Sequence, residues 1–268
     1  MKVAIATRAD KKNLPLYEMF KNSVKKFHPE IEVLLWDEEK VATYNDPIFY
    51  YRASPIIGKE IINDYDLILL MDCDQIMLGR IDHILDGDYD IGTVLNVNRY
   101  DPTRYGMITF QGVQPNQYYN NGLVAIRNNE NGKRFLDEWN RLCHTEYFHR
   151  LQYREQDMLN VLCHYGDYRV LCFDDYDVPG GNYTWNGLVS FGEWARSEMR
   201  GLDVVIPKGE DNYPDRDITL KVIHWGGGAD KVKGNYRIYF SPEVTHYIDW
   251  LVSDSDKAYE KNKDTPQL

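Results

Sequence analysis

Hydrophobic and polar positions alternate along the first hundred residues in two distinct periods. Apolar runs with the length of buried strands occupy residues 2–7, 31–36, 66–71 and 89–94. Helical spacing of apolar residues covers 14–27, and Ser54 followed by Pro55 predicts a second helix to residue 62 with Ser54 as its N-cap. Strands that alternate with helices are typical of a parallel sheet covered by helices on both faces.

The remaining chain is less regular. Strands are predicted at 122–127 and 220–224, and helices at 132–143, 155–164 and 242–252. Two long segments, 96–121 and 174–201, lack periodicity, and loops of that length are usually functional. We expect a single α/β domain over residues 1–252, with a Rossmann-like, mostly parallel central sheet flanked by helices, and a polar tail at 253–268.

Composition limits the classes of partner. Hydrophobic residues make up 43% of the 268 positions, which is enough for a sizeable core. The formal net charge of −11 argues against a broad electrostatic attraction to nucleic acid. An acidic protein that binds an anionic substrate therefore needs a bound cation or a few placed basic side chains.

Cysteine usage and hydropathy bear on location. The cysteines are Cys73, Cys143, Cys163 and Cys172. They show no CxxC pairing and no zinc-ligand spacing, so we expect free thiols in a reducing compartment. The opening MKVAIATRAD does not have the pattern of a signal peptide, and no stretch approaches the length of a membrane span. We expect a cytoplasmic protein from a bacterial or viral context, with a chain trimmed of its anchor as the alternative.

The most informative stretch is DLILLMDCDQIML at residues 66–78. Its apolar run ends in Asp72 and Asp74, at the carboxyl end of a predicted parallel strand, where open α/β sheets bind ligands. Buried carboxylates are costly unless they are paired or bound to a cation. Hard oxygen ligands suit Mn²⁺ or Mg²⁺, and such ions commonly carry a substrate diphosphate. An acid pair in a turn is the plainer interpretation, but the strand before it favours a metal site.

Polar residues at other predicted strand ends suit a nucleotide. Thr7 and Arg8 end the first strand, where a hydroxyl and a backbone edge fit a base and a ribose; a polar strand exit explains them equally well. His224 leaves the last strand, and neutral imidazole is a good ligand for Mn²⁺. Gly226 and Gly227 follow it and would let the backbone approach phosphate oxygens.

Three further groups have ordinary structural explanations beside the functional ones. Arg52 has the charge to bind a diphosphate, although a surface arginine is the plainer interpretation. Asn120 and Asn121 carry amides that suit sugar hydroxyls, but Asn-Gly is also a common turn. Gln156 and Asp157 lie at a helix start, where the helix dipole favours acids; facing a donor sugar is the alternative.

Taken in order, these motifs resemble the GT-A glycosyltransferases, and most closely glycosyltransferase family 8, the glycogenin and bacterial galactosyltransferase group. The matching segments are IATRAD (5–10), YYRAS (50–54), LLMDCD (69–74), YNNGLVAIR (119–127), EQDMLN (155–160) and HWGG (224–227). They follow the order typical of that family, from near the start of the chain to about residue 233. The resemblance implies a GT-A fold, a divalent metal (Mn²⁺ or Mg²⁺) and a nucleotide-sugar donor.

The resemblance also implies residue roles. The metal ligands that it implies are Asp72, Asp74 and His224. The residues that it places against the donor are Thr7, Arg8, Arg52, Asp72, Gly226, Gly227 and Lys231. The reacting centre that it implies is lined by Asn120, Gln156 and Asp157. Two positions depart from the family pattern: Glu155 stands for the first acid of D-Q-D, and Asn121 for the alanine of F-N-A-G. Lys231 stands one position later than the pattern expects.

We therefore predict a metal-dependent glycosyltransferase that moves a sugar from a UDP-sugar to a hydroxyl of a glycan acceptor, with retention of configuration. Asp157 is the candidate nucleophile. The acceptor is expected to contact the irregular segments 96–118 and 176–200. An inverting enzyme is the alternative; it needs a general base near the acceptor, for which Asp174, Asp175 and Asp177 are the candidates.

Two other classes of function are considered. A sugar nucleotidyltransferase would want a glycine-rich basic loop after the first strand, and residues 7–16 contain no glycine. A non-catalytic carbohydrate-binding protein with a decayed GT-A fold should have lost metal ligands, and all candidate ligands are present. The donor sugar, the acceptor and the oligomeric state stay open at this point.

Overall fold

The structure is a computed structural model that describes residues 1–95, 118–151, 153–173, 196–209, 217–224, 240–255 and 259. The chain divides into two compact units made of interleaved segments. Unit 1 comprises residues 1–10, 31–72 and 82–173, and unit 2 comprises 11–30, 73–81 and 174–268. The single domain expected over 1–252 stays a prediction.

Unit 1 is built on a six-stranded mixed sheet. In spatial order its strands are β2 (Glu32–Trp36), β1 (Val3–Arg8), β3 (Leu67–Met71), β6 (Tyr119–Arg127), β5 (Ile91–Leu95) and β7 (Val170–Cys172). Neighbouring strands pair in parallel except at β6, which is antiparallel to both β3 and β5. The mostly parallel α/β sheet expected from the alternating pattern is therefore confirmed.

Burial on both faces explains the apolar runs at the centre of this sheet. Every residue of β3 is buried, and β1 is buried from Val3 to Thr7. The two strands pair in parallel register, with Ile5 opposite Leu69 and Ala6 opposite Leu70. Their carboxyl ends consequently reach the same edge of the sheet.

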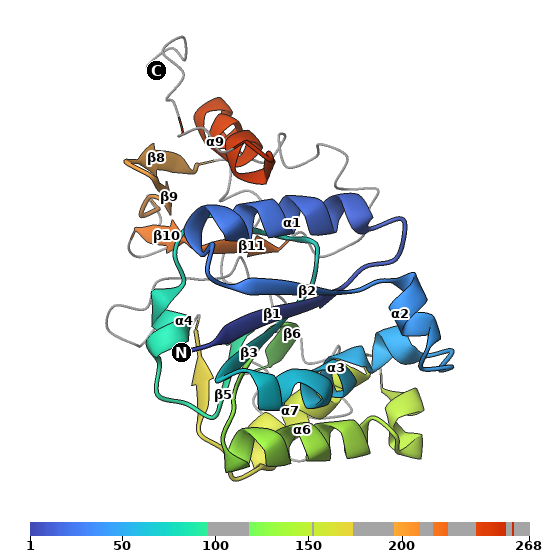
Figure 1. Cartoon of the computed structure of the whole chain (residues 1–268). Coiled ribbons are helices and arrows are strands. Elements are labelled where there is room, and N and C mark those ends of the chain that lie inside the picture. The colour runs from blue at the N-terminus through green and yellow to red at the C-terminus, as the bar shows by residue number, and fades with distance from the viewer. Residues whose placement is uncertain are drawn as a thin grey trace. The chain divides into compact units, whose positions relative to one another are not determined.

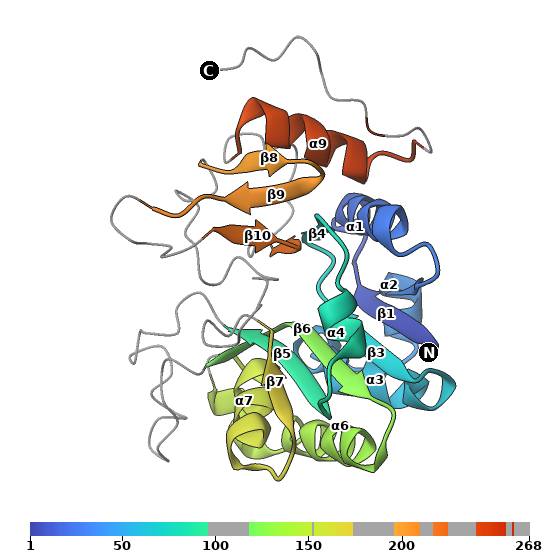
Figure 2. The same cartoon turned by 90° about the vertical axis from the view of Figure 1, so that its left-hand side faces the viewer.

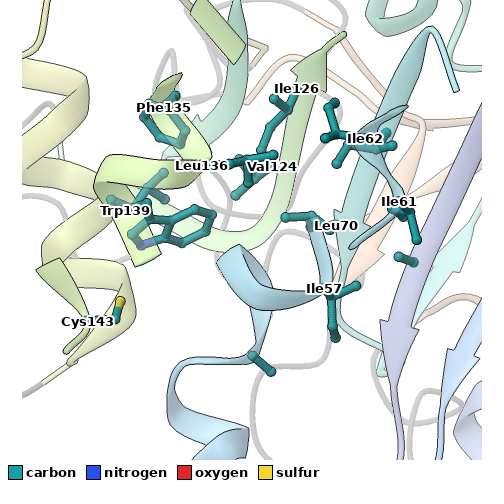
Figure 3. Packing of buried hydrophobic residues seen from close by; sticks show 14 of the residues in the cluster. Ile57, Ile61, Ile62, Leu70, Val124, Ile126, Phe135, Leu136, Trp139 and Cys143 are labelled. Carbon is teal, nitrogen blue, oxygen red and sulfur yellow. The ribbon is translucent and has the colours of Figure 1, made fainter. Parts of the chain in front are cut away.

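Helices cover the sheet and supply the core of unit 1. The described helices are α2 (Glu38–Ala42), α3 (Ala53–Ile61), α4 (Asp82–Asp86), α6 (Glu130–Leu142) and α7 (Glu155–Tyr165), with 3₁₀ turns at Phe49–Tyr51, Ile62–Asp64 and Glu146–Arg150. Helices α3, α6 and α7 lie on one face (Figure 1). There Ile57, Leu70, Val124, Leu136 and Trp139 belong to one buried cluster (Figure 3). This packing fixes the start of α7, because the Trp139 indole donates a hydrogen bond to the carbonyl of Glu155 at 2.9 Å.

Unit 2 combines two helices with short antiparallel strands. Helix α1 (Leu14–Phe27) contacts α9 (Pro242–Val252), and Asn22 donates a hydrogen bond to the carbonyl of Val252 at 3.0 Å. Strand β4 (Gln75–Met77) pairs with β11 (Val222–His224). A separate sheet joins β8 (Glu198–Arg200), β9 (Asp203–Ile206) and β10 (Ile218–Leu220), with α9 against β8 (Figure 2).

Three local expectations need correction. Helix α3 begins at Ala53, with Arg52 as its N-cap, so the predicted N-cap role of Ser54 is wrong. The single strand expected at 220–224 is two strands, because Leu220 pairs with Val204 in one sheet and Val222 pairs with Met77 in another. Strand β6 begins at Tyr119 and not at residue 122.

Among the described residues, no helix has both the length and the apolar character that crossing a membrane requires.

Candidate functional site

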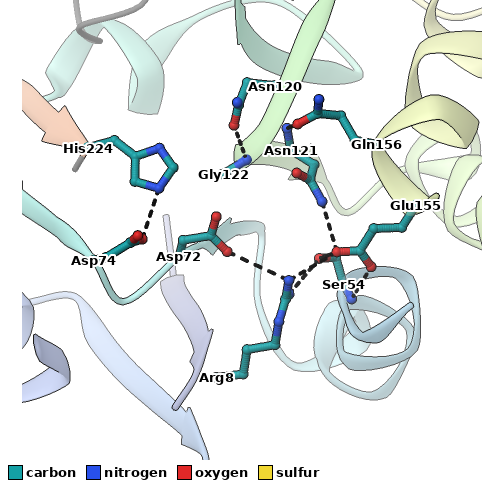
Figure 4. Close-up of polar contacts among 10 residues, drawn as sticks. All are labelled: Arg8, Ser54, Asp72, Asp74, Asn120, Asn121, Gly122, Glu155, Gln156 and His224. Carbon is teal, nitrogen blue, oxygen red and sulfur yellow. Dashed lines mark hydrogen bonds and ion pairs between the residues drawn. The ribbon is translucent and has the colours of Figure 1, made fainter. Parts of the chain in front are cut away.

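The carboxyl edge of the unit 1 sheet brings an arginine beside an acid. Arg8 ends β1, and Asp72 directly follows β3, where its backbone N–H donates to the carbonyl of Gly122 at 3.0 Å. A guanidinium nitrogen of Arg8 lies 3.7 Å from Oδ1 of Asp72 (Figure 4). Both side chains are partly exposed, so the pair can be reached from solvent.

Glu155 is the second acid that binds this arginine. It starts α7 and is only 3% exposed, and its Oε1 accepts from Arg8 at 3.1 Å. The Ser54 hydroxyl donates to Oε1 at 3.1 Å, and the Ser54 backbone N–H donates to Oε2 at 3.2 Å. Burial is the largest influence and raises the pKa of Glu155, whereas Arg8 lowers it and Asp72 raises it; the net shift is upward.

Asn121 and Gln156 extend the network along β6 and α7. The side-chain amide of Asn121 donates to Oε1 of Glu155 at 2.8 Å, and its backbone N–H donates to Oε1 of Gln156 at 3.1 Å (Figure 4). Asn120 instead accepts from the backbone N–H of Gly122 at 2.7 Å. The two asparagines therefore lie within a strand that faces α7, and the turn that Asn-Gly suggested is absent there.

Asp157 is buried in a different set of contacts. Its side chain is 2% exposed, and one oxygen accepts from the Tyr118 hydroxyl at 2.6 Å. The other oxygen accepts from the backbone N–H of Tyr153 at 2.7 Å. Burial raises the pKa of Asp157 more than these hydrogen bonds lower it. Both carboxylate oxygens are thus engaged within unit 1.

A small hollow opens among these residues within unit 1. It is lined by Ala6, Thr7, Arg8, Ser54, Ile57, Leu70, Met71, Asp72 and Asn121. The Thr7 hydroxyl is buried and finds no hydrogen-bond partner among the described residues. Since an unsatisfied buried hydroxyl is costly, a polar group of a ligand in this hollow would relieve it.

Unit 2 holds a second pair of candidate ligands. Nε2 of His224 lies 2.8 Å from Oδ1 of Asp74 (Figure 4). Both side chains are mostly buried, and the antiparallel pairing of β11 with β4 places His224 opposite Gln75. A carboxylate oxygen and an imidazole nitrogen are ligands that Mn²⁺ accepts.

Arg52 is bound to a nearby acid, and several other predicted site residues lie outside the described residues. The Nε of Arg52 binds Oδ2 of Asp46 at 2.6 Å. Burial favours a higher pKa for Asp46, but the hydrogen bonds from Arg52 and Ile48 are enough to lower it. Positions outside the described residues include Gly226, Gly227, Lys231, Asp174, Asp175 and Asp177, together with the expected acceptor segments apart from Tyr118 and residues 196–200.

Sequence reasoning missed the contact that joins Arg8, Ser54 and Asn121 to Glu155. The only advance signal was that Glu155 and Asn121 both depart from the family pattern. Their contact is tertiary, between residues 34 positions apart, so neither departure explained the other before the structure was known.

Solved structures that are similar to this chain include glycosyltransferases. The galactosyltransferase LgtC, in complex with donor and acceptor sugar analogs, has a TM-score of 0.57 and 18% identity, over 96% of this chain and 98% of that chain. An active-site glutamine-to-glutamate mutant of LgtC gives 0.57 and 17%. The bifunctional glycosyltransferase WbbM, in its apo form, gives 0.58 and 12% over 95% of this chain and 50% of that chain. No protein-family model and no curated protein matches the sequence.

At these identities the likeness concerns the fold, and it agrees with the order of motifs along the chain. The predicted GT-A resemblance is therefore confirmed at that level: the chain has the fold of the GT-A glycosyltransferases.

Proposed function

We propose that the protein is a metal-dependent glycosyltransferase that takes a sugar from a UDP-sugar and transfers it to a hydroxyl of a glycan acceptor. The observation that carries the proposal is the meeting of Arg8, Asp72 and Glu155 at the carboxyl edge of a GT-A sheet. Ligands bind at that edge in open α/β folds. The LgtC neighbour was solved with donor and acceptor sugar analogs, which supports the class of substrate.

The metal ligands of this proposal are Asp72, Asp74 and His224. Only Cys73 separates the two aspartates in the chain, so their backbones cannot move far apart, and Asp74 already contacts His224. Two carboxylates and an imidazole form a donor set that fits Mn²⁺, with Mg²⁺ as the alternative. When bound, such an ion neutralises charge on the diphosphate and on the departing UDP.

The other predicted roles are carried forward as parts of the same proposal. Thr7 binds the base or ribose, and its buried hydroxyl without a described partner supports this role. Asn120, Gln156 and Asp157 line the reacting centre, with retention of configuration. Because both oxygens of Asp157 accept hydrogen bonds, its contacts favour holding Tyr118 in place over nucleophilic attack. Gly226, Gly227 and Lys231 are proposed to bind the diphosphate. The cytoplasmic location stays a prediction from the sequence.

A donor-hydrolysis assay tests the proposal. The protein is incubated with a panel of UDP-sugars and MnCl₂, and UDP release is measured with and without chelator. Asp72→Asn and Asp74→Asn should each lower turnover at least about a hundredfold, because each removes a ligand charge from the metal. Asp64→Asn, an exposed acid of unit 1, is the control and should leave turnover unchanged.

The products separate the competing functions. Release of UDP supports a glycosyltransferase, whereas release of pyrophosphate from UTP and a sugar phosphate would identify a nucleotidyltransferase. Binding of glycans without turnover of any UDP-sugar would identify a carbohydrate-binding protein. Full turnover in either aspartate variant would refute the metal assignment.

A further inference from the structure

The two arginines predicted to bind the donor are similarly exposed and each is paired with an acid, but they stand at different places. Arg52 is held by Asp46 at 2.6 Å, and the side chains of this pair are only 18% and 10% exposed. Arg8 stands at the sheet edge between Asp72 and Glu155 and lines the hollow that also contains the Thr7 hydroxyl. Arg8 lines this hollow while it is paired with Glu155, whereas Arg52 does not line it and would have to leave the nearly buried Asp46 to reach a ligand there, which is costly.

The two residues that depart from the family pattern, Glu155 and Asn121, contact each other beside Arg8. Asn121 donates its side-chain amide to Glu155, the acid that binds Arg8. The alanine of the family pattern has no polar side chain and could not make this bond. The Ser54 hydroxyl donates to Glu155 and accepts from Arg8 at 3.0 Å, so it contacts both members of the Arg8–Glu155 pair.

The position of Arg8 also leaves it able to bind an anion. Its side chain is 21% exposed and lines the hollow, whereas that of Glu155 is 4% exposed and is not among the residues that line it. The guanidinium presents five N–H donors in a fixed fork, and Ser54 and Glu155 fix its orientation. A guanidinium whose orientation is already fixed loses little conformational entropy when it binds a phosphate.

We infer that Arg8, and not Arg52, is the arginine that contacts the diphosphate of the donor, and that Glu155, assisted by Asn121, is the positioning residue that holds it there. This inference rests on the proposed function, because it assigns residues to the nucleotide site of that enzyme. It replaces the donor role expected of Arg52 from its place in the sequence. It also gives both departures from the family pattern one physical purpose.

The test measures the affinity for UDP in the presence of MnCl₂ by calorimetry, with thermal melting of every variant as the folding check. Arg8→Gln should weaken UDP binding at least about tenfold, which corresponds to ~1.4 kcal/mol. Arg52→Gln should lower the melting temperature but change the UDP affinity by less than about twofold. Arg8→Lys keeps the charge without the fork and should show an intermediate affinity.

A double-mutant cycle distinguishes positioning from a merely structural role. Glu155→Gln and Asn121→Ala should each weaken UDP binding when Arg8 is present, the second by less. Neither should weaken it further in the Arg8→Gln background, since the residue they position is gone. Should Glu155→Gln itself fail to fold, Asn121→Ala carries the cycle alone.

Three outcomes overturn the inference, and they differ from one another. Loss of UDP affinity in Arg52→Gln but not in Arg8→Gln would return the donor role to Arg52 and leave the proposed function intact. If Glu155→Gln and Asn121→Ala weaken UDP binding as much in the Arg8→Gln background as they do alone, these two residues do not act through Arg8. No UDP binding by the unmutated protein, together with no release of UDP from any UDP-sugar, would remove the proposed function and the inference together.

Discussion

Nε2 of His224 and Oδ1 of Asp74 lie 2.8 Å apart, although 150 positions separate the two residues in the chain. The contact follows from strand pairing, because Ile223 lies opposite Ile76 and His224 opposite Gln75 in the antiparallel ladder. The imidazole and the carboxylate are therefore held side by side by backbone hydrogen bonds. Such a preformed pair costs little entropy to assemble when a cation binds.

Replacing His224 with alanine should weaken Mn²⁺ affinity at least about tenfold, because one of three proposed ligands is lost. The side chain is mostly buried at the end of a short strand, so the melting temperature should also fall, by about a few degrees. A Mn²⁺ titration followed by calorimetry measures the affinity. His149→Ala removes an exposed histidine of unit 1 and serves as the control. An unchanged titration in His224→Ala would remove this residue from the metal site.

Tyr118 is fully buried and donates to Asp157 at 2.6 Å, so Tyr118→Phe should destabilise the protein. The change removes a hydrogen bond to a buried acid and leaves one of its oxygens short of a donor, at a cost of ~1.5–3 kcal/mol. Urea unfolding gives the free energy of unfolding. The matched change Tyr147→Phe, at a tyrosine that is 63% exposed, should cost less than ~0.5 kcal/mol. Equal stability of Tyr118→Phe and the unmutated protein would contradict the contact.

Gly132 makes the junction between β6 and α6 possible. A Cβ at this position would lie 2.0 Å from the backbone carbonyl oxygen of Arg127, which ends β6. Its N–H also donates to the N-cap side chain of Asn129 at 2.7 Å, so the first turn cannot shift freely. Gly132→Ala should therefore destabilise the protein by ~2 kcal/mol or more.

Gly58→Ala is the comparison for that prediction. Its Cβ would meet a methyl group of Leu136 at 2.6 Å, and a side chain can turn aside more easily than a backbone carbonyl. The loss of unfolding free energy should therefore be smaller for Gly58→Ala than for Gly132→Ala. The reverse order in urea unfolding would show that the α3–α6 contact is the stiffer of the two.

The elements that the sequence predicts well are those whose pattern is set by local burial. Helices α1 and α9 have the predicted bounds, since one apolar face determines each of them. The all-apolar β3 is likewise predicted to within a residue. Short strands such as β4 are missed, because three residues carry no periodicity and the pairing partner of β4 is almost 150 positions away.

The candidate site shows the same difference between residues with a local signal and residues placed by distant contacts. Asp72, Asp74 and His224 are proposed as ligands because each stands at or near the end of a predicted strand, which is a local signal. The contact of Arg8 with Glu155 is invisible to such reasoning, because 147 positions separate the two residues; the contact of Arg52 with Asp46 spans only six positions. Ser54 illustrates the point: local rules suggest an N-cap, yet its hydroxyl binds Glu155, 101 positions away.

Asp90 gives the clearest expected dependence of stability on pH. Its side chain is 1% exposed, and burial would raise its pKa, but hydrogen bonds from Arg169, Asn129 and Asn131 lower the pKa to about 2. The unfolded chain has a pKa of about 3.9 for the same group and binds its proton first as pH falls. The stabilisation from this carboxylate is therefore present above about pH 4 and is lost between about pH 4 and pH 2. Because Arg169 is mostly exposed and its charge is screened, the stabilisation should be on the order of 1 kcal/mol.

The change that tests this is Asp90→Asn, which keeps the shape but removes the charge. Urea unfolding at pH 7, 5, 4 and 3 should show the difference in unfolding free energy between the two proteins to be largest at pH 7 and to shrink below pH 4. Asp137→Asn removes an acid whose side chain is 65% exposed and which pairs with Lys59; it should have little effect at any of these pH values. A difference between Asp90→Asn and the unmutated protein that stays constant from pH 7 to pH 3 would mean that Asp90 acts through packing alone. Asp90, which directly precedes β5 and accepts hydrogen bonds from Asn129 and Asn131 at the start of α6, would then owe nothing to its charge.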